Sequence, residues 1–253
     1  MGRSGPRCNL DLFQQALARL PLAELDGLWL LGDLTDLGDV DSLRAVLDSA
    51  AGSGLSVRFV LGNHDVAGDV LLPATAPRVR PAGERAEAVG SRLRLAGLGV
   101  EPAAEPHAYR FTPTPVWADD FLVLLSHFPV FSMRAPVTSE GHRYAGDALG
   151  GCEITTALGR RSRPTVILHG HLHLRAARAE GRVLQLGFGA LAEAGHELAL
   201  VSLEVEPDEQ ALTVGIQTLA LEPDRPGVAL SSVAPSWRFA ADRWLPSTAR
   251  LLA

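Results

Sequence analysis

Apolar residues in this chain fall into short continuous runs separated by amphipathic stretches. The runs that predict buried strands lie at 28–31, 57–61, 121–125 and 165–168. Apolar residues recur at helical spacing up to Leu20, where Asn9 or Asp11 caps the expected helix, and again over about 41–51. Buried strands that alternate with helices indicate parallel pairing through right-handed crossovers. The pattern therefore predicts an α/β fold.

The middle and the end of the chain follow other patterns. The segment 66–120 is rich in Pro, Ala and Arg. We expect it to be an irregular excursion from the fold and a candidate lid, with strands near 93–98 and 107–111. The later apolar runs, which favour antiparallel strands joined by turns, lie at 183–186, 198–205 and 212–221.

The chain shows no internal repeat and no low-complexity segment that would mark a second domain. A length of 253 residues with 47% hydrophobic content is enough to bury one large core. We expect a single domain over residues 1–222. The tail at 223–253 then packs on this domain, with Trp237 and Trp244 as anchors.

Each of the four buried runs ends at a residue that binds metals in many proteins. The segments are Gly32-Asp33-Leu34-Thr35-Asp36, Gly62-Asn63-His64-Asp65, Ser126-His127-Phe128-Pro129 and Gly170-His171-Leu172-His173. In an open α/β sheet, ligands collect beyond the carboxyl ends of the strands. A carboxylate can bridge two divalent ions, while imidazoles and an amide oxygen fill the remaining positions. We therefore expect two ions, about 3.5–4 Å apart, that activate water and polarise a phosphoryl group.

The alternation of His169, His171 and His173 refines this expectation. Side chains two residues apart point to the same side of a strand, so all three imidazoles could face one site. The turn expected at Gly170 breaks the period, so two of the three reach the metals. We expect His169 to be the one that lies behind the ligands, where it orients a ligand or packs.

Taken in order, the four segments resemble the signature of the calcineurin-like metallophosphoesterase superfamily. That signature reads D-x-H, G-D-x-x-D, G-N-H-[DE], an isolated His after a strand, and G-H-x-H, and four of its five blocks are present from Gly32 to His173. The resemblance implies a β-sandwich of two sheets flanked by helices. It also implies a metal-dependent hydrolase that acts on a small phosphoester.

The same resemblance assigns the metal ligands. Asp33 would bridge the two metals. The other ligands of one metal would be Asn63, His127 and His171, whereas His173 would serve the second metal. Manganese, iron and zinc all suit this set of nitrogen and oxygen ligands.

The resemblance also implies the chemistry. Metal-bound hydroxide would attack phosphorus in line, and His64 would contact the phosphate and protonate the leaving oxygen. Asp65 would orient His64, whereas we expect Asp36 to form structural hydrogen bonds. Short chains with this motif set resemble phosphodiesterases, so we expect a diester in preference to a monoester.

The Asp-x-His block that opens the family signature does not occur ahead of Gly32. In the family this block supplies two ligands to the metal that His173 serves, so we expect weak binding there and an impaired enzyme without the first strand. Asp11 falls in a helical turn and is no substitute. We expect a misplaced start: codons upstream of Met1, in frame, should encode an apolar strand ending in Asp-x-His. Genome sequence that instead shows a stop codon or unrelated residues there would contradict this expectation.

Composition excludes several other classes of protein. The net charge of −6 argues against a broad electrostatic grip on nucleic acid, which also disfavours a nuclease of the same superfamily. All 23 basic residues are Arg, so a Lys Schiff base and a P-loop lysine are excluded. Cys8 and Cys152 form no disulfide framework or zinc motif. The start of the chain lacks an apolar signal segment and no run is long enough to span a membrane, so we expect a cytoplasmic protein.

Several further features have two interpretations. His142 and Arg143 could edge the site and contact substrate, or could be ordinary loop residues. The arginines of the 66–120 segment could recognise phosphate or form a solvated surface; they are Arg78, Arg80, Arg85, Arg92 and Arg94. We expect His107 and His196 to be ordinary residues.

Two other functions compete with hydrolysis. The stretch 187–192 matches a G-x-G-x-x-A dinucleotide pattern, but it lacks a clear following helix and a downstream acidic residue. A second alternative is a relative without catalytic activity that binds a phosphate ligand or a protein partner. The presence of both His64 and Asp65 argues against this alternative, because a binding module needs no positioned acid.

Overall fold

A computed structural model of the chain describes eight stretches of residues. They are 6–66, 76–83, 85–90, 92–112, 120–192, 196–206, 211–222 and 227–247. Parts of the 66–120 segment and the end of the tail therefore lie outside the described residues. Within the described part, no helix is long and apolar enough to cross a membrane.

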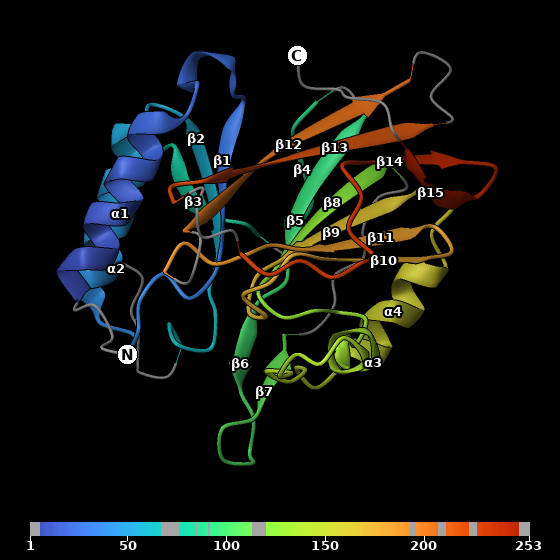
Figure 1. The fold of residues 1–253 in the computed structure, drawn as a ribbon, viewed down its shortest axis with the longest axis horizontal. Coiled ribbons are helices and arrows are strands. Elements are labelled where there is room, and N and C mark those ends of the chain that lie inside the picture. The colour runs from blue at the N-terminus through green and yellow to red at the C-terminus, as the bar shows by residue number, and fades with distance from the viewer. Residues whose placement is uncertain are drawn as a thin grey trace.

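The first half of the chain forms a small parallel sheet covered by two helices. Its strands are β1 (Gly27–Leu31), β2 (Ser56–Val60) and β3 (Val79–Pro81), with β2 in the centre. Helices α1 (Pro6–Arg19) and α2 (Val40–Gly52) stand beside this sheet at the left of Figure 1, and a short 3-10 turn, η1 (Leu22–Glu24), follows α1. Phe13 and Leu43 of the helices pack on Phe59 of the sheet. Both helices begin earlier than expected, and the cap of α2 is Asp39, whose carboxylate accepts a hydrogen bond from the Ser42 backbone N–H.

A six-stranded sheet forms the centre of the molecule, in the order β10-β11-β9-β8-β5-β4. Its strands are β4 (Glu87–Ala88), β5 (Leu93–Gly97), β8 (Phe121–Ser126), β9 (Thr165–His169), β10 (Ala176–Glu180) and β11 (Val183–Gly187). The four inner strands are parallel, and the two edge strands are antiparallel to their neighbours. Helix α4 (Gly151–Gly159) packs Ile154 and Leu158 on the outer face of this sheet, and α3 (Arg134–Ser139) lies near it.

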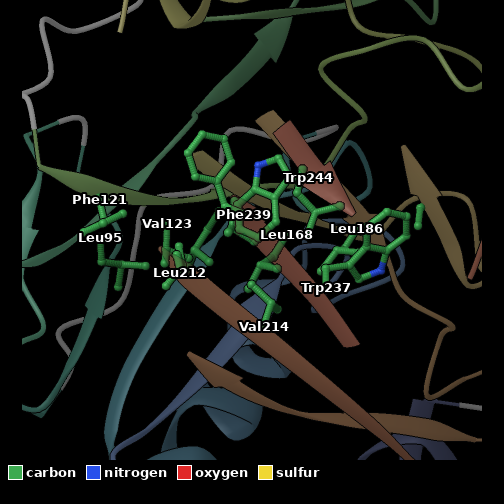
Figure 2. Packing of buried hydrophobic residues seen from close by; sticks show 14 of the residues in the cluster. Leu95, Phe121, Val123, Leu168, Leu186, Leu212, Val214, Trp237, Phe239 and Trp244 are labelled. Carbon is green, nitrogen blue, oxygen red and sulfur yellow. The ribbon is translucent and has the colours of Figure 1, made fainter. Parts of the chain in front are cut away.

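A four-stranded antiparallel sheet covers the other face. Its strands are β12 (Glu197–Val205), β13 (Leu212–Ala220), β14 (Ser236–Ala240) and β15 (Arg243–Ser247). Side chains of both sheets meet in one apolar cluster, in which Trp237 and Trp244 lie against Leu168 and Leu186 (Figure 2). The two-sheet sandwich flanked by helices, which the family resemblance implies, is therefore confirmed.

The described part of the 66–120 segment is built into this framework. Strand β3 extends the small sheet, and β5 pairs along its length with β8 in the central sheet. A separate hairpin of β6 (Val100–Pro102) and β7 (Tyr109–Phe111) projects from the body at the bottom of Figure 1. These strands show that much of the segment supports the core; residues 67–75 and 113–119, where a lid would have to be sought, lie outside the described residues.

Two features of the later chain differ from the sequence expectation. The run at 183–186 pairs in parallel with β9, because β10, which the sequence analysis did not detect, takes the antiparallel position at the sheet edge. The tail adds β14 and β15 to the sheet that β12 and β13 begin. Both tryptophans of the tail are buried, as expected.

Candidate metal centre

The expected ligands lie just beyond the carboxyl ends of four strands from two sheets. Asp33 and Asn63 follow β1 and β2, and His127 and His171 follow β8 and β9. Ligand atoms of Asp33, His127 and His171 all lie within 4.8 Å of one another. The His127 Nε2 atom is 3.0 Å from Asn63 Oδ1 and 3.3 Å from Asp33 Oδ1. Residues that are far apart in the sequence are thus gathered at one point, as the sequence analysis predicts.

The ligand atoms face one another at short distances. His127 is almost completely buried, and its Nδ1–H donates a hydrogen bond of 2.8 Å to the backbone carbonyl oxygen of Leu31. The other ring nitrogen, Nε2, is directed at the oxygens of Asp33 and Asn63, where it either donates a proton to them or offers its lone pair to a metal ion. His171 Nε2 is also buried without a hydrogen-bond partner among the described residues. A carboxylate oxygen, an amide oxygen and two imidazole nitrogens at this spacing are ligands of divalent metals, so the set fits such an ion.

The electrostatic surroundings keep the ligand side chains deprotonated. Burial lowers the pKa of His171 to about 3, so its imidazole is neutral at physiological pH. Burial alone would raise the pKa of Asp33. The hydrogen bonds and charge interactions with His127 and His64 outweigh burial and leave the pKa of the Asp33 carboxyl lowered. A metal ion binds only these deprotonated forms.

The backbone at the ligands is strained. Asp33, His171 and His173 have φ angles of 51°, 61° and 54°, in the left-handed region that non-glycine residues rarely adopt. Each such residue costs on the order of 1 kcal/mol or more and persists where the surrounding structure imposes it. This conformation occurs at three of the five expected ligands, and in the described residues also at four others: His107, His196, Ala241 and Asp242.

Two glycines make room for the ligands. A Cβ atom added at Gly62 would lie 2.1 Å from Asp33 Oδ1 and 2.8 Å from the His127 ring, and one at Gly32 would lie 2.5 Å from His127 Nδ1. Any side chain at these positions would push the ligands apart. The close approach explains why a glycine precedes the ligand in both loops.

Asp65 has a different role from the expected one. Its buried carboxylate accepts hydrogen bonds from the backbone N–H groups of Gly62, Leu34 and Thr35 and from the Thr35 hydroxyl, at 2.8–3.1 Å. Burial raises its pKa in spite of these donors. The expectation that Asp65 orients the His64 ring is therefore corrected: all four donors belong to the loops that follow β1 and β2, so Asp65 ties these two loops together.

Asp36 takes the position beside His64. The His64 Nδ1–H donates to the backbone carbonyl oxygen of Asp36 at 2.8 Å, and the Asp36 carboxylate lies 3.3 Å away. The His64 backbone N–H donates to Asp33 Oδ1 at 3.0 Å, which places the residue next to the ligand cluster. Since Nδ1 is engaged, Nε2 is the ring nitrogen left for a substrate. Partial burial lowers the pKa of His64, but the Asp36 carbonyl and the nearby carboxylates outweigh burial and raise it.

Comparison with known proteins agrees with this geometry. The family model for calcineurin-like phosphoesterases matches residues 7–175, well over half of the chain. The chain belongs to the calcineurin-like phosphoesterase family. Membership supports metal-dependent hydrolysis of a phosphoester as the class of reaction.

Two solved structures align with this phosphoesterase, both at low sequence identity. A predicted phosphoesterase from Streptococcus pneumoniae is 15% identical with a TM-score of 0.37, covering 91% of this chain and 90% of that chain. The protein TT1561 of Thermus thermophilus is 12% identical with a TM-score of 0.46, covering 84% of this chain and 93% of that chain. No curated protein sequence matches the chain.

The remaining candidate residues of the phosphoesterase lie around the cluster or apart from it. His169 is fully buried beneath it, with a pKa lowered by burial to about 4 and its Nδ1–H bonded to the Gly170 carbonyl oxygen. His173 is exposed and lies outside the group of Asp33, His127 and His171. Within the described residues, no hydrogen bond or ion pair joins His142 or Arg143 to the ligands.

The arginines of the 66–120 segment form contacts elsewhere. Arg78 donates to the Gly54 carbonyl oxygen, Arg80 to Glu87, and Arg94 to Asp120. These contacts favour the structural interpretation of the three residues.

Replacing Gly62 by Ala should displace Asp33 and His127 and abolish tight metal binding, because the added methyl group overlaps both side chains. Gly52→Ala is the matched control, since a Cβ at the end of α2 meets nothing within 4 Å. Metal content after gel filtration in limiting manganese measures the effect. Equal metal content in the two variants would show that the ligand cluster does not form as described.

Proposed function

We propose that this chain hydrolyses a small phosphodiester with a divalent ion held by Asp33, Asn63, His127 and His171. The convergence of ligand atoms from these four residues carries the proposal. One carboxylate oxygen, one amide oxygen and two imidazole nitrogens meet there, and an ion that takes the place of a proton on His127 Nε2 would be bound by all four residues. Family membership then supports phosphoester hydrolysis as the use of that cation.

The residues around the proposed ion position the phosphoryl group for the reaction. When bound, the ion supplies Lewis-acid activation of a phosphoryl oxygen and of water. Asp33, held by the His64 backbone N–H, and His127, held by Leu31, fix the position of the phosphoryl group relative to His64. The oxygen of water bonds to phosphorus while the bond from phosphorus to the departing alcohol oxygen breaks.

His64 is placed to supply the proton for that alcohol. Its Nδ1 donates to the Asp36 carbonyl oxygen, so the proton for the alcohol comes from Nε2, and the raised pKa favours the protonated imidazolium. The products are a phosphomonoester and an alcohol, and solvent takes and returns the remaining protons.

A second ion is proposed to bind more weakly. Asp33 and His173 are its only assigned ligands in this sequence, and His173 lies on the exposed side of the cluster. Two ligands hold a divalent ion less tightly than four. Of the metals that suit such a set, manganese is the one we propose to use in tests.

His64→Ala and His171→Ala should separate acid catalysis from metal binding. We expect His64→Ala to lower kcat by about 10²–10⁴-fold with manganese content unchanged, because it removes only the proton donor. We expect His171→Ala to lose manganese and activity together. Hydrolysis of diphenyl phosphate, whose more basic phenolate leaving group benefits from a proton, and metal analysis of the same samples provide both readouts. Parallel loss of metal in the His64 variant would mean that this residue is structural, and inactivity of the manganese-loaded natural chain on all phosphoesters would favour the non-catalytic alternative.

The pH dependence should move with the charge of Asp36. Activity that needs protonated His64 falls as pH rises through the His64 pKa. Asp36→Asn removes a negative charge 3.3 Å from Nδ1, so the alkaline limb of the kcat profile should shift to lower pH. The shift should shrink at high ionic strength because Asp36 is exposed. Asp41→Asn, at an exposed carboxylate paired with Arg44, is the control and should leave the alkaline limb of the kcat profile in place. An alkaline limb in Asp36→Asn at the same pH as in the natural chain would exclude the proposed interaction between Asp36 and His64.

A further inference from the structure

A cavity opens between the central sheet and the four-stranded sheet, apart from the metal ligands. Its volume is about 410 Å³, within the size range of small-molecule sites. It is bordered by the end of β11, the start of β10, β13 and the loop before β14. The lining side chains include Arg175, Leu186, Phe188, Ile216, Thr218 and Ala234.

The chemistry of this cavity favours an uncharged apolar group. Leu186, Phe188 and Ile216 supply aliphatic and aromatic surface. Among the described residues, Arg175 is the one charged side chain in the lining, and its charge is already matched: Nε lies 3.4 Å from the buried Glu197 carboxylate and Nη2 donates to the Gly227 carbonyl oxygen. An anion would have to compete with Glu197, whereas an apolar group gains by leaving water.

The cavity lies on the same edge of the central sheet as the metal ligands. Gly187, in its wall, pairs with His169 at the end of β9, and the Phe188 backbone N–H donates to the His169 carbonyl oxygen at 3.1 Å. Arg175 follows His173 by two residues. Neighbouring strands are about 4.8 Å apart, so the wall stands one strand beyond the strand that carries His171.

The cavity and His64 adjoin opposite ends of a row of strands. The row runs from β11 through β9 to β8 in the central sheet. The hydrogen bond between His127 and Leu31 then joins the end of β8 to the end of β1, which pairs with β2, the strand that His64 follows. An alcohol protonated by His64 leaves on the β2 side. The ester group on the β11 side is then the group that stays on phosphorus.

We propose that this cavity binds the retained ester group of the substrate and selects phosphodiesters in which that group is bulky and apolar. The inference rests on the proposed function, because it assumes that the phosphate sits at the cluster of Asp33, His127 and His171. Ala234 and Thr218 both line the cavity and neither is a proposed metal ligand, so larger side chains at these positions can fill it without replacing a ligand.

A pair of substrates that share a leaving group tests the proposal. The manganese-loaded chain is assayed on phenyl 4-nitrophenyl phosphate and methyl 4-nitrophenyl phosphate. Both release 4-nitrophenolate, so the ratio of their kcat/KM values reports the retained group. We expect the phenyl ester to be preferred by about tenfold or more, as for other apolar pockets. Ala234→Leu and Thr218→Leu, which fill the cavity, should bring the ratio near one by slowing the phenyl ester alone.

The matched control is Ala104→Leu, at an exposed position in the β6–β7 hairpin, which should leave the ratio unchanged. An unchanged ratio in both filling variants, or equal losses on both esters, would overturn the proposal.

Calorimetric binding of phenylphosphonate and methylphosphonate distinguishes failure of the cavity proposal from failure of the proposed function. If neither diester is hydrolysed, the proposed function fails, while tighter binding of phenylphosphonate that Ala234→Leu abolishes still supports the cavity. Equal binding of the two phosphonates by the natural chain would overturn it.

Discussion

The hydrogen bond from His127 Nδ1 to the Leu31 carbonyl oxygen is the interaction on which the centre depends. It joins the end of β8 in the central sheet to the end of β1 in the small sheet, and it fixes the ring so that Nε2 faces Asp33 and Asn63. One buried hydrogen bond therefore sets both the relative position of two sheets and which ring nitrogen faces the site.

Asp65 performs the corresponding task within the small sheet. A carboxylate that accepts from four donors in two loops holds Asp33 and His64 in register without contacting either imidazole nitrogen. Because Asp65 holds the loops, the carboxylate that lies beside His64 Nδ1 and can raise the pKa of His64 is the exposed Asp36. A buried residue that maintains geometry and an exposed residue that adjusts proton affinity are two separate requirements, and the loops after β1 and β2 meet them with different carboxylates.

The sequence predicts much of this because the ligands stand at strand ends, where apolar runs stop. Asp33, Asn63, His127 and His171 could be named from that pattern. Which carboxylate meets His64 could not, because Asp36 and Asp65 both belong to the motifs and only the path of the loop after β1 decides between them. The role of the Leu31 carbonyl oxygen as the acceptor for His127 could not be predicted either, because every residue has a backbone carbonyl and no residue type marks this one. Strand β10 was missed because the run Ala176–Glu180 contains little apolar signal.

The charge of the ligand set has a consequence for the substrate. Of the four proposed ligands, only Asp33 is anionic; Asn63 is neutral, and the pKa of about 3 keeps His171 neutral as well. A divalent ion held there would retain one positive charge, two minus one, which a phosphodiester monoanion neutralises. The chain as a whole is acidic, so long-range attraction cannot supply the affinity. On the function that we propose, this local charge binds the phosphate and the cavity beside β11 buries the organic group, so the ligand set and the cavity together select the substrate.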